Sequence, residues 1–133
     1  MKIVLDTNIF VSAYFHDGNP RKIYTRVING LDELYITDDI LIELYKVLSR
    51  KKFDLSEIAV EDFINIIEDH SVKIICKNKP ENISRDKDDN KILQCGFEGN
   101  VDFIITGDKD LLVLEKYKNI QITNAKDYLN MVL

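Results

Sequence analysis

The acidic residues of this sequence gather where apolar segments end or where a helix is expected to begin. Four of them can meet at one place in a folded chain, namely Asp6, Glu43, Asp89 and Asp108. Carboxylates in contact repel, by about 4 kcal/mol for a pair 4 Å apart at an effective dielectric constant of about 20. Divalent cations offset that repulsion, and hard oxygen ligands without histidine or cysteine suit Mg²⁺ or Mn²⁺ rather than zinc. Such ions can activate water and hold a phosphate for in-line displacement, so the four acids predict metal-dependent phosphodiester hydrolysis.

Asp6 and Glu43 have environments in which an ordinary surface role is costly. Asp6 follows an apolar run that reads as a fully buried strand, where an unpaired charge is unfavourable. Thr7 and Asn8 could orient its carboxylate, or the waters of a metal, by hydrogen bonding. Glu43 lies on the border of the apolar face of its helix and can lean inward. The alternatives are a turn or cap role for Asp6 and a surface ion pair between Glu43 and a lysine.

Two further segments carry several acids each. Asp86, Asp88 and Asp89 stand at the start of a predicted helix, where one or two acids can do no more than stabilise the helix dipole, by about 0.3–1 kcal/mol. Asp89 is preferred for the site because it projects from the first turn beside core positions, and Asp88 is the alternative. Asp108 is preferred over Asp110 because it is nearer the end of a strand, although either acid could simply cap the next helix.

Apolar runs alternate with amphipathic patterns along the chain. Buried strands are predicted at 2–5, 34–36, 72–76, 102–105 and 120–122. Helices are predicted at about 20–29, 38–50, 56–67, 88–98 and 125–131, with a short one from 108, and core positions on the fourth include Phe97. Such alternation indicates an α/β fold with a mostly parallel sheet and helices on both faces. Ligands of such sheets bind beyond the carboxyl ends of the strands, which is where the four acids fall.

The composition is that of an ordinary soluble globular protein, with 45% hydrophobic and 31% charged residues in a chain of 133. We expect a single domain over residues 1–133. No apolar run approaches the roughly 18 residues that cross a membrane, and the start lacks the apolar stretch of a signal peptide, so we expect a cytoplasmic protein without membrane association. The net charge of −5 argues against a nucleic-acid binder, but two bound divalent ions would bring it to −1.

Together these motifs resemble those of the PIN-domain nucleases, in particular the toxins of VapC-like prokaryotic toxin–antitoxin pairs. The resemblance rests on Ile-Val-Leu-Asp-Thr-Asn at 3–8, on Glu43 in its helix, and on the acidic segments 86–91 and 105–112. It runs nearly end to end and follows the order of the family. The combination of the Asp-Thr-Asn start with the later Thr-Gly-Asp-x-Asp-Leu-Leu segment is highly specific. The sequence departs from its relatives at Lys87, where they often have proline.

The resemblance implies a three-layer α/β/α fold around a five-stranded, mostly parallel sheet. It makes Asp6 and Asp89 the main ligands of Mg²⁺ or Mn²⁺, with Glu43 and Asp108 completing the acidic site. The residues expected to support the site are Thr7, Asn8, Asp88, Thr106 and Asp110. The resemblance further implies cleavage of RNA, assembly as a homodimer, and inhibition by an antitoxin protein.

An RNA substrate needs basic residues at the rim of so acidic a site. We expect two or three contributors from the set Arg21, Lys22, Arg26, Lys46, Arg50, Lys51, Lys52, Lys91 and Lys109, the rest being solvated surface. Tyr14, Phe15 and Tyr45 could stack on bases, although core packing is the simpler interpretation of each.

Three other functions compete with a toxin nuclease. A haloacid-dehalogenase-type phosphatase also has an aspartate after its first strand, but its second aspartate two positions later is replaced here by Asn8. A catalytically inactive PIN module that binds RNA or protein would not need to retain all four acids. A PIN nuclease of RNA maturation or decay is hardly distinguishable from a toxin by sequence.

Overall fold

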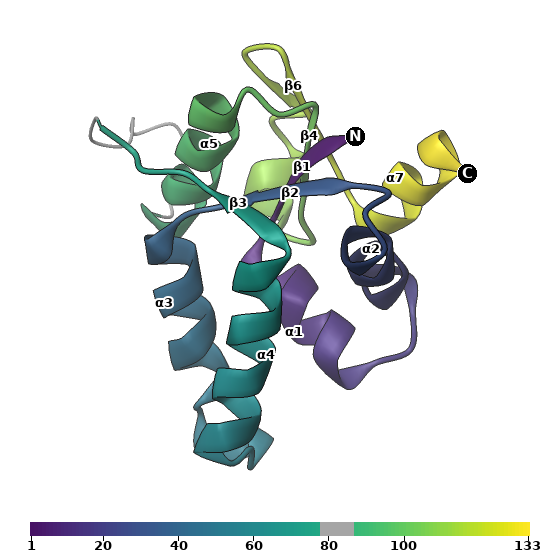
Figure 1. Cartoon of the computed structure of the whole chain (residues 1–133). Helices are drawn as coiled ribbons and strands as arrows, with labels where there is room; N and C mark the ends of the chain where they lie inside the picture. The colour runs from purple at the N-terminus through teal and green to yellow at the C-terminus, as the bar shows by residue number, and fades with distance from the viewer. Residues whose placement is uncertain (78–86) are drawn as a thin grey trace.

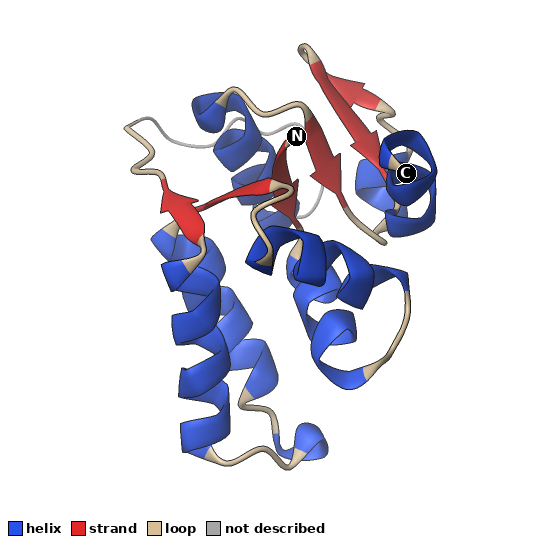
Figure 2. Cartoon of the chain, turned by 45° about the vertical axis from the view of Figure 1, so that its right-hand side comes forward, coloured by secondary structure: helices blue, strands red, loops and turns tan. Residues whose placement is uncertain are grey.

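The computed structural model describes residues 1–77 and 87–133 and is built around one sheet (Figures 1 and 2). Along the sheet the strands follow the order β3-β2-β1-β4-β6-β5. Their bounds are β1 (Lys2–Leu5), β2 (Glu33–Ile36), β3 (Ser71–Lys73), β4 (Phe103–Ile105), β5 (Lys116–Tyr117) and β6 (Ile120–Thr123). Neighbours are parallel except at the edge, where β5 pairs antiparallel with β6.

The predicted α/β fold with a mostly parallel sheet flanked by helices is therefore confirmed, with a correction to the strand count. Within the described residues the sheet has six strands rather than five. The additional strand, β5, is only two residues long, and a segment so short carries no readable alternation of apolar and polar side chains.

Helices surround the sheet and project beyond it. In the described residues they are α1 (Thr7–Phe15), α2 (Asn19–Ile28), α3 (Asp38–Leu48), the 3₁₀ helix η1 (Lys51–Phe53), α4 (Glu57–Asp69), α5 (Lys87–Gly99), α6 (Lys109–Leu112) and α7 (Ala125–Val132). Helix α5 packs against β1, β2 and β4, whereas α1 packs against α2 and α2 against α7. Helices α3 and α4 run side by side and extend below the sheet in Figure 1. No helix in this described part of the chain is long and apolar enough to span a membrane.

The structure corrects three local predictions. Helix α1 was not expected, because its apolar side chains face both the core and α2 and so form no single stripe. Strand β3 covers Ser71–Lys73 rather than 72–76, since its ladder with β2 ends near Ile74, whose N–H donates to the Ile36 carbonyl. Phe97, expected in the core, is 48% exposed, and the Lys118 ammonium lies 3.7 Å from the centre of its ring.

Helix α5 approaches the sheet closely because it carries glycine where the two surfaces meet. A Cβ atom placed on Gly96 would lie only 2.8 Å from Cδ1 of Ile104 in β4. Ile92 and Leu93, nearer the start of the helix, are fully buried against the same sheet. The position of α5, and of the acids in its first turn, is therefore set by this close packing.

A buried carboxylate joins three elements on the other side of the molecule. Asp32, which precedes β2, accepts hydrogen bonds from Arg26 Nε in α2 (2.8 Å) and from the Tyr128 hydroxyl in α7 (2.7 Å). Burial alone would raise the pKa of Asp32, but the hydrogen bonds from Arg26 and Tyr128 and the charge of Arg26 outweigh it and lower that pKa. The carboxylate is thus held in its charged form and ties α2 and α7 to the sheet.

Replacing Tyr128 by phenylalanine should destabilise the fold in a pH-dependent way. The loss of one hydrogen bond to a charged, buried carboxylate is expected to lower the free energy of unfolding by about 1.5–3 kcal/mol at neutral pH. Because the pKa of Asp32 is lower in the folded than in the unfolded chain, its carboxylate stabilises the fold at a pH above the ordinary pKa of aspartate. This stabilisation is lost as the pH falls through the folded-state pKa. The difference between wild type and Tyr128→Phe in urea denaturation should therefore shrink in acid. Tyr45→Phe, at a half-buried tyrosine of α3, is the control, and equal losses in both variants would contradict the assignment.

Candidate active site

Three carboxylates from separate segments meet at the carboxyl ends of β1 and β4. Oxygen atoms of Asp6, Asp89 and Asp108 all lie within 4.8 Å of one another. Asp6 follows β1, Asp108 follows β4, and Asp89 lies in the first turn of α5. Asp6 and Asp89 are only 7% and 3% exposed, and Asp108 is half-buried. Of the acids that the sequence offered near the start of α5, Asp89 is thus the one in this group, while Asp86 lies outside the described residues.

Asp6 accepts hydrogen bonds from the start of α1 and from the residue that follows β4. Its Oδ1 accepts a hydrogen bond from the Thr7 N–H (2.7 Å) and caps α1, and its Oδ2 accepts one from the Thr106 hydroxyl (2.7 Å). The contact with Thr106 follows from the register of the sheet, in which Leu5 pairs with Ile105. Thr106 Oγ1 also accepts from the Asp108 N–H (2.9 Å). One threonine hydroxyl therefore fixes two of the three acidic segments relative to each other.

Asp108 combines a structural role with its place in the cluster. Its Oδ1 accepts from the Asp110 N–H (2.8 Å) and caps α6, the ordinary role that the sequence also allowed. The contact of Asp110 with Asp108 is thus made by its backbone N–H, and its supporting role stays a prediction. Asn8 Oδ1 accepts from the Gly107 N–H at 3.3 Å, so the loop after β4 is tied to the start of α1.

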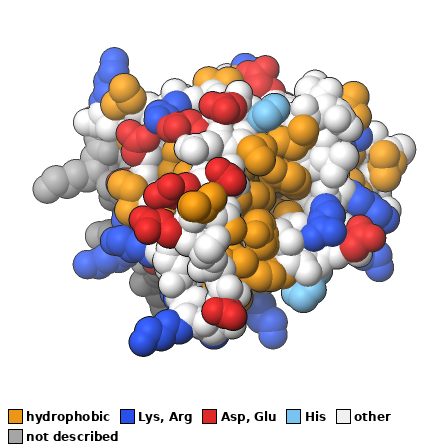
Figure 3. All heavy atoms as spheres, turned by 60° about the horizontal axis from the view of Figure 1, so that its bottom comes forward, with side chains coloured by type: hydrophobic (Ala, Val, Ile, Leu, Met, Phe, Trp, Pro, Cys, Tyr) orange, Lys and Arg blue, Asp and Glu red, His pale blue; other side chains and the backbone are white. Residues whose placement is uncertain are grey.

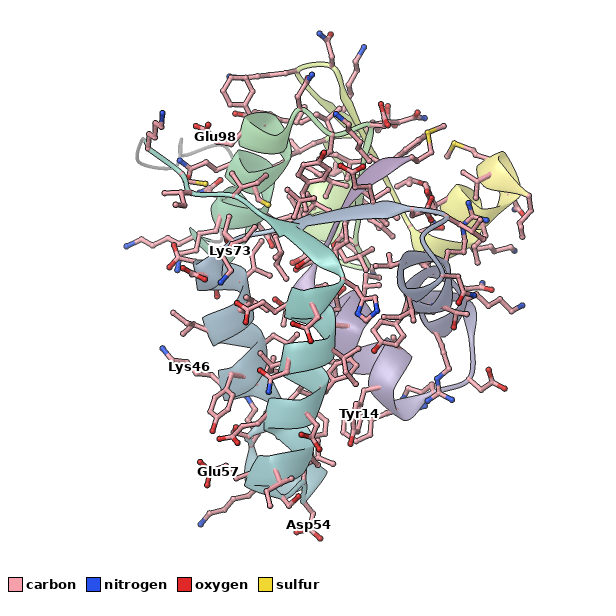
Figure 4. All side chains as sticks on the ribbon, viewed as in Figure 1. Tyr14, Lys46, Asp54, Glu57, Lys73 and Glu98 are labelled. Atoms are coloured by element: carbon pink, nitrogen blue, oxygen red, sulfur yellow. The ribbon has the colours of Figure 1, made fainter. Side chains whose placement is uncertain are left out.

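Glu43 leans toward the cluster from α3. Its Oε2 accepts a hydrogen bond from the Thr7 hydroxyl (2.8 Å). The pKa of Glu43 is raised, and burial is the largest cause. A hydrogen bond with Asp88 and the negative charges of Asp88 and Asp6 raise this pKa further, whereas the hydrogen bond from Thr7 lowers it. Within the described residues it forms no ion pair with a lysine, and Lys46 points outward from α3 in Figure 4. The alternative of a surface ion pair between Glu43 and a lysine is thus not the arrangement found. Asp88 lies beside Glu43 and is not part of the group formed by Asp6, Asp89 and Asp108.

A groove of about 360 Å³ opens onto these acids. Its walls are formed by Asp6, Thr7, Asn8, Val11, Ser12, Glu43, Val47, Arg50, Lys52, Phe53, Asp88, Asp89 and Asp108. Sequence reasoning missed Val11 and Ser12 because it missed α1; counting three and four residues on from Asn8 along a helix would have placed both on the same face. It also missed Phe53. A second groove of about 470 Å³ shares Asn8 and Ser12 with the first.

The donor set fits hard divalent cations. All the ligand atoms that converge are carboxylate oxygens, which Mg²⁺ and Mn²⁺ prefer. At an effective dielectric constant of about 20, two such charges about 4.8 Å apart repel by roughly 3–4 kcal/mol. Two of the three side chains are also largely removed from water, so a bound cation would offset a larger unfavourable energy of their charges. Asp6, Asp89 and Asp108 can therefore hold a metal, with Glu43 close by.

The family model of the PIN domain matches residues 2–110. The chain belongs to the PIN-domain family. Domains of this family are generally nucleases, and an acidic cluster at the carboxyl edge of a parallel sheet agrees with that activity. All four acids singled out in the sequence lie within the matched region.

Two similar proteins accord with this PIN-domain assignment. An uncharacterized protein of Methanocaldococcus jannaschii is 36% identical over 129 residues, which covers 93% of this chain and 82% of that protein. Among solved structures, VapBC2 of Rickettsia felis bound to a DNA fragment from its promoter has a similar fold, with a TM-score of 0.67 and 17% identity over 93% of this chain and 98% of the matched chain. The solved structure supports the fold, and the M. jannaschii protein shows a relative that is similar over most of this chain.

Replacing Thr106 by valine should weaken metal binding without removing any acid. Valine has the shape of threonine but neither donates to Asp6 nor accepts from the Asp108 N–H, so both segments lose their common anchor. We expect Mn²⁺ affinity, measured by calorimetry, to fall about 10- to 100-fold, as for other groups that orient a metal ligand. Thr106→Ser keeps the hydroxyl and should bind Mn²⁺ nearly as wild type does; equal affinities for the valine and serine variants would contradict this role.

Proposed function

We propose that this PIN domain is a Mg²⁺- or Mn²⁺-dependent endoribonuclease. The observation that carries the proposal is the convergence of Asp6, Asp89 and Asp108 within 4.8 Å, on the floor of an open groove. Family membership supports nuclease activity, and the resemblance to VapC-like toxins favours RNA as the substrate.

In this mechanism the chain acts mainly by holding charged groups in place. Thr7 and Thr106 fix both oxygens of Asp6, so the carboxylate need not reorganise when a metal or substrate binds. Asp89 is anchored by α5, and Asp108 by its cap on α6. A bound Mg²⁺ or Mn²⁺ supplies positive charge for the phosphate and a more acidic water. Glu43 is proposed to complete the metal-binding site, oriented by the Thr7 hydroxyl.

The two grooves support cleavage within a strand rather than at its end. They share Asn8 and Ser12, and the acids stand beside this junction. We infer that a strand crossing the site passes from one groove into the other. An exonuclease would instead need a wall that stops the chain on one side of the cleaved bond.

Cleavage of a circular single-stranded RNA tests this proposal directly. Wild-type protein should cut it in Mg²⁺ or Mn²⁺, and excess chelator should stop the reaction. Asp6→Asn, which loses one of the clustered charges, should lower the rate by more than about 100-fold, beyond the loss typical of a residue that only orients a ligand. Asp69→Asn, at an exposed aspartate at the end of α4, should cleave like wild type. Cleavage that persists without divalent ions would refute the mechanism, and cleavage of linear RNA alone would refute its internal character.

We further propose that the nuclease acts as a toxin controlled by a separate antitoxin protein. The structure of VapBC2 bound to a DNA fragment from its promoter supports this role by analogy of fold. An apolar surface is present for such a partner, since Figure 3 shows apolar side chains gathered on the lower face of the molecule beside acidic ones. The homodimer implied by the resemblance is part of the same proposal. The alternatives are a nuclease of RNA maturation or decay and an inactive binding module.

Controlled expression in growing bacteria separates these roles. Wild type should arrest growth, Asp6→Asn should not, and co-expression of a short open reading frame adjacent to the gene should relieve the arrest. Light scattering of the purified protein reports whether it is a dimer. Normal growth with active wild-type nuclease would favour RNA maturation or decay. Arrest by both proteins would show that toxicity does not need the metal site.

A further inference from the structure

The active-site groove has a basic end as well as an acidic one. Glu43, Val47 and Arg50 are spaced four and three residues apart, so α3 and its continuation present them in a row along one wall. At a rise of 1.5 Å per residue, the end of α3 at Leu48 lies about 7.5 Å beyond Glu43, and Arg50 follows two residues later. Lys52 and Phe53 of η1 line the groove at this end. A polymer lying over the acids would thus reach two cations within a few monomer units.

The positive charges of these two side chains are not paired with a carboxylate in the described part of the chain. Neither Arg50 nor Lys52 forms an ion pair within residues 1–77 and 87–133. Other basic side chains have clear structural partners: Arg21 donates to the Ala13 and Tyr14 carbonyls, Arg26 binds Asp32, and Lys73 binds Asp38 and Glu68. Arg50 and Lys52 therefore remain available for an anionic ligand, although carboxylates line the same groove.

The wall that carries them is anchored by aromatic packing. The ring of Phe53 stacks on Phe15 of α1, with centres 4.8 Å apart and planes 24° from parallel. Phe15 in turn meets Tyr14 edge to face, and Tyr14 meets Phe63 of α4. The Lys52 ammonium lies 5.0 Å from the centre of the Phe53 ring. In Figure 4 the labelled Asp54 and Glu57, which follow this turn in sequence, mark its place at the lower end of the molecule. The turn is thus held as a fixed surface.

We propose that Arg50 and Lys52 bind backbone phosphates of the RNA strand next to the cleaved bond, and that Phe53 supports the adjoining base. The proposal rests on the nuclease function above and names where its substrate binds. An acidic peptide would also satisfy two cations. A phosphodiester strand is favoured because it provides one phosphate for the acidic end, others for the basic end, and bases for the aromatic wall, all at regular spacing.

Binding to a fluorescent single-stranded RNA of about 12 nucleotides, a usual span for such sites, tests this subsite without turnover. The measurements use the Asp6→Asn protein in Mg²⁺, into which Arg50→Gln, Lys52→Gln or both are introduced. Each change should weaken binding roughly 3- to 5-fold, as expected for an exposed charge contact. The double variant should also reduce the slope of log affinity against log salt by about 1.4, since each lost phosphate contact removes about 0.7.

Lys51→Gln is the matched control, because Lys51 lies in the same turn and is exposed but does not line the groove. It should change affinity and salt slope much less. If it weakens binding as strongly as Arg50→Gln and Lys52→Gln, only the general charge of the region matters and the subsite is refuted. Unchanged binding by the double variant refutes it as well.

Phe53→Leu separates base contact from charge. Leucine keeps an apolar side chain in contact with Phe15 but removes the flat ring, and circular dichroism checks that the variant is folded. It should weaken binding of RNA more than binding of an abasic strand of equal length, whereas Arg50→Gln should weaken both alike. Equal losses for the two strands with Phe53→Leu would remove Phe53 from the proposal. Tighter binding of a glutamate-rich peptide than of RNA, with the same dependence on Arg50 and Lys52, would assign the surface to a protein partner and overturn it.

Failure of the subsite and failure of the nuclease function give different results. If wild type does not cleave RNA but binding still depends on Arg50 and Lys52, the subsite stands and the nuclease function falls. If wild type cleaves RNA and the double variant has an unchanged kcat/KM, the function stands and the subsite falls.

Discussion

The mutual repulsion of carboxylates at one edge of the sheet is the constraint around which this molecule is organised. Asp6, Asp89 and Asp108 come from distant parts of the chain, and their charges would drive the segments apart. The fold opposes this with short, directional contacts: two hydrogen bonds to Asp6, one cap on α6, and a threonine hydroxyl shared between two loops. The acids therefore remain close at a cost in stability that a bound cation would recover.

The sheet topology explains how these contacts can form. Strand β1 lies in the interior of the sheet between β2 and β4, and parallel neighbours end at the same edge. Residues 6 and 106 are thereby adjacent although they are 100 positions apart in sequence. Helix α5 completes the arrangement from one face, and its approach depends on Gly96, seven residues beyond Asp89 and without any chemistry of its own. Packing in the core thus decides the spacing of charges at the surface.

Much of this arrangement could be predicted from the sequence, and the elements that could not be predicted were missed for physical reasons. Asp6 and Asp108 could be predicted because each lies just beyond a strongly apolar strand. Gly30, with a φ of 78°, follows Asn29, the C-cap of α2, as its residue type suggests. Helix α1 was missed because a helix buried on two sides has no polar face to reveal its period. The network of Arg26, Asp32 and Tyr128 was invisible for another reason, since its last partner lies 96 residues away and nothing local marks the pairing.

The carboxylate of Asp6 serves two purposes, and they can be lost separately. It faces the other acids, and it also caps α1 by accepting from the Thr7 N–H. Asparagine caps a helix about as well as aspartate, and serine nearly so, whereas alanine does not. A relative that lacked the acidic cluster would still need a capping side chain at this position to begin α1. The residue at position 6 of any relative is therefore subject to two separate requirements, the acidic cluster and the cap of α1. Only a residue that cannot cap a helix would indicate that the start of α1 has changed.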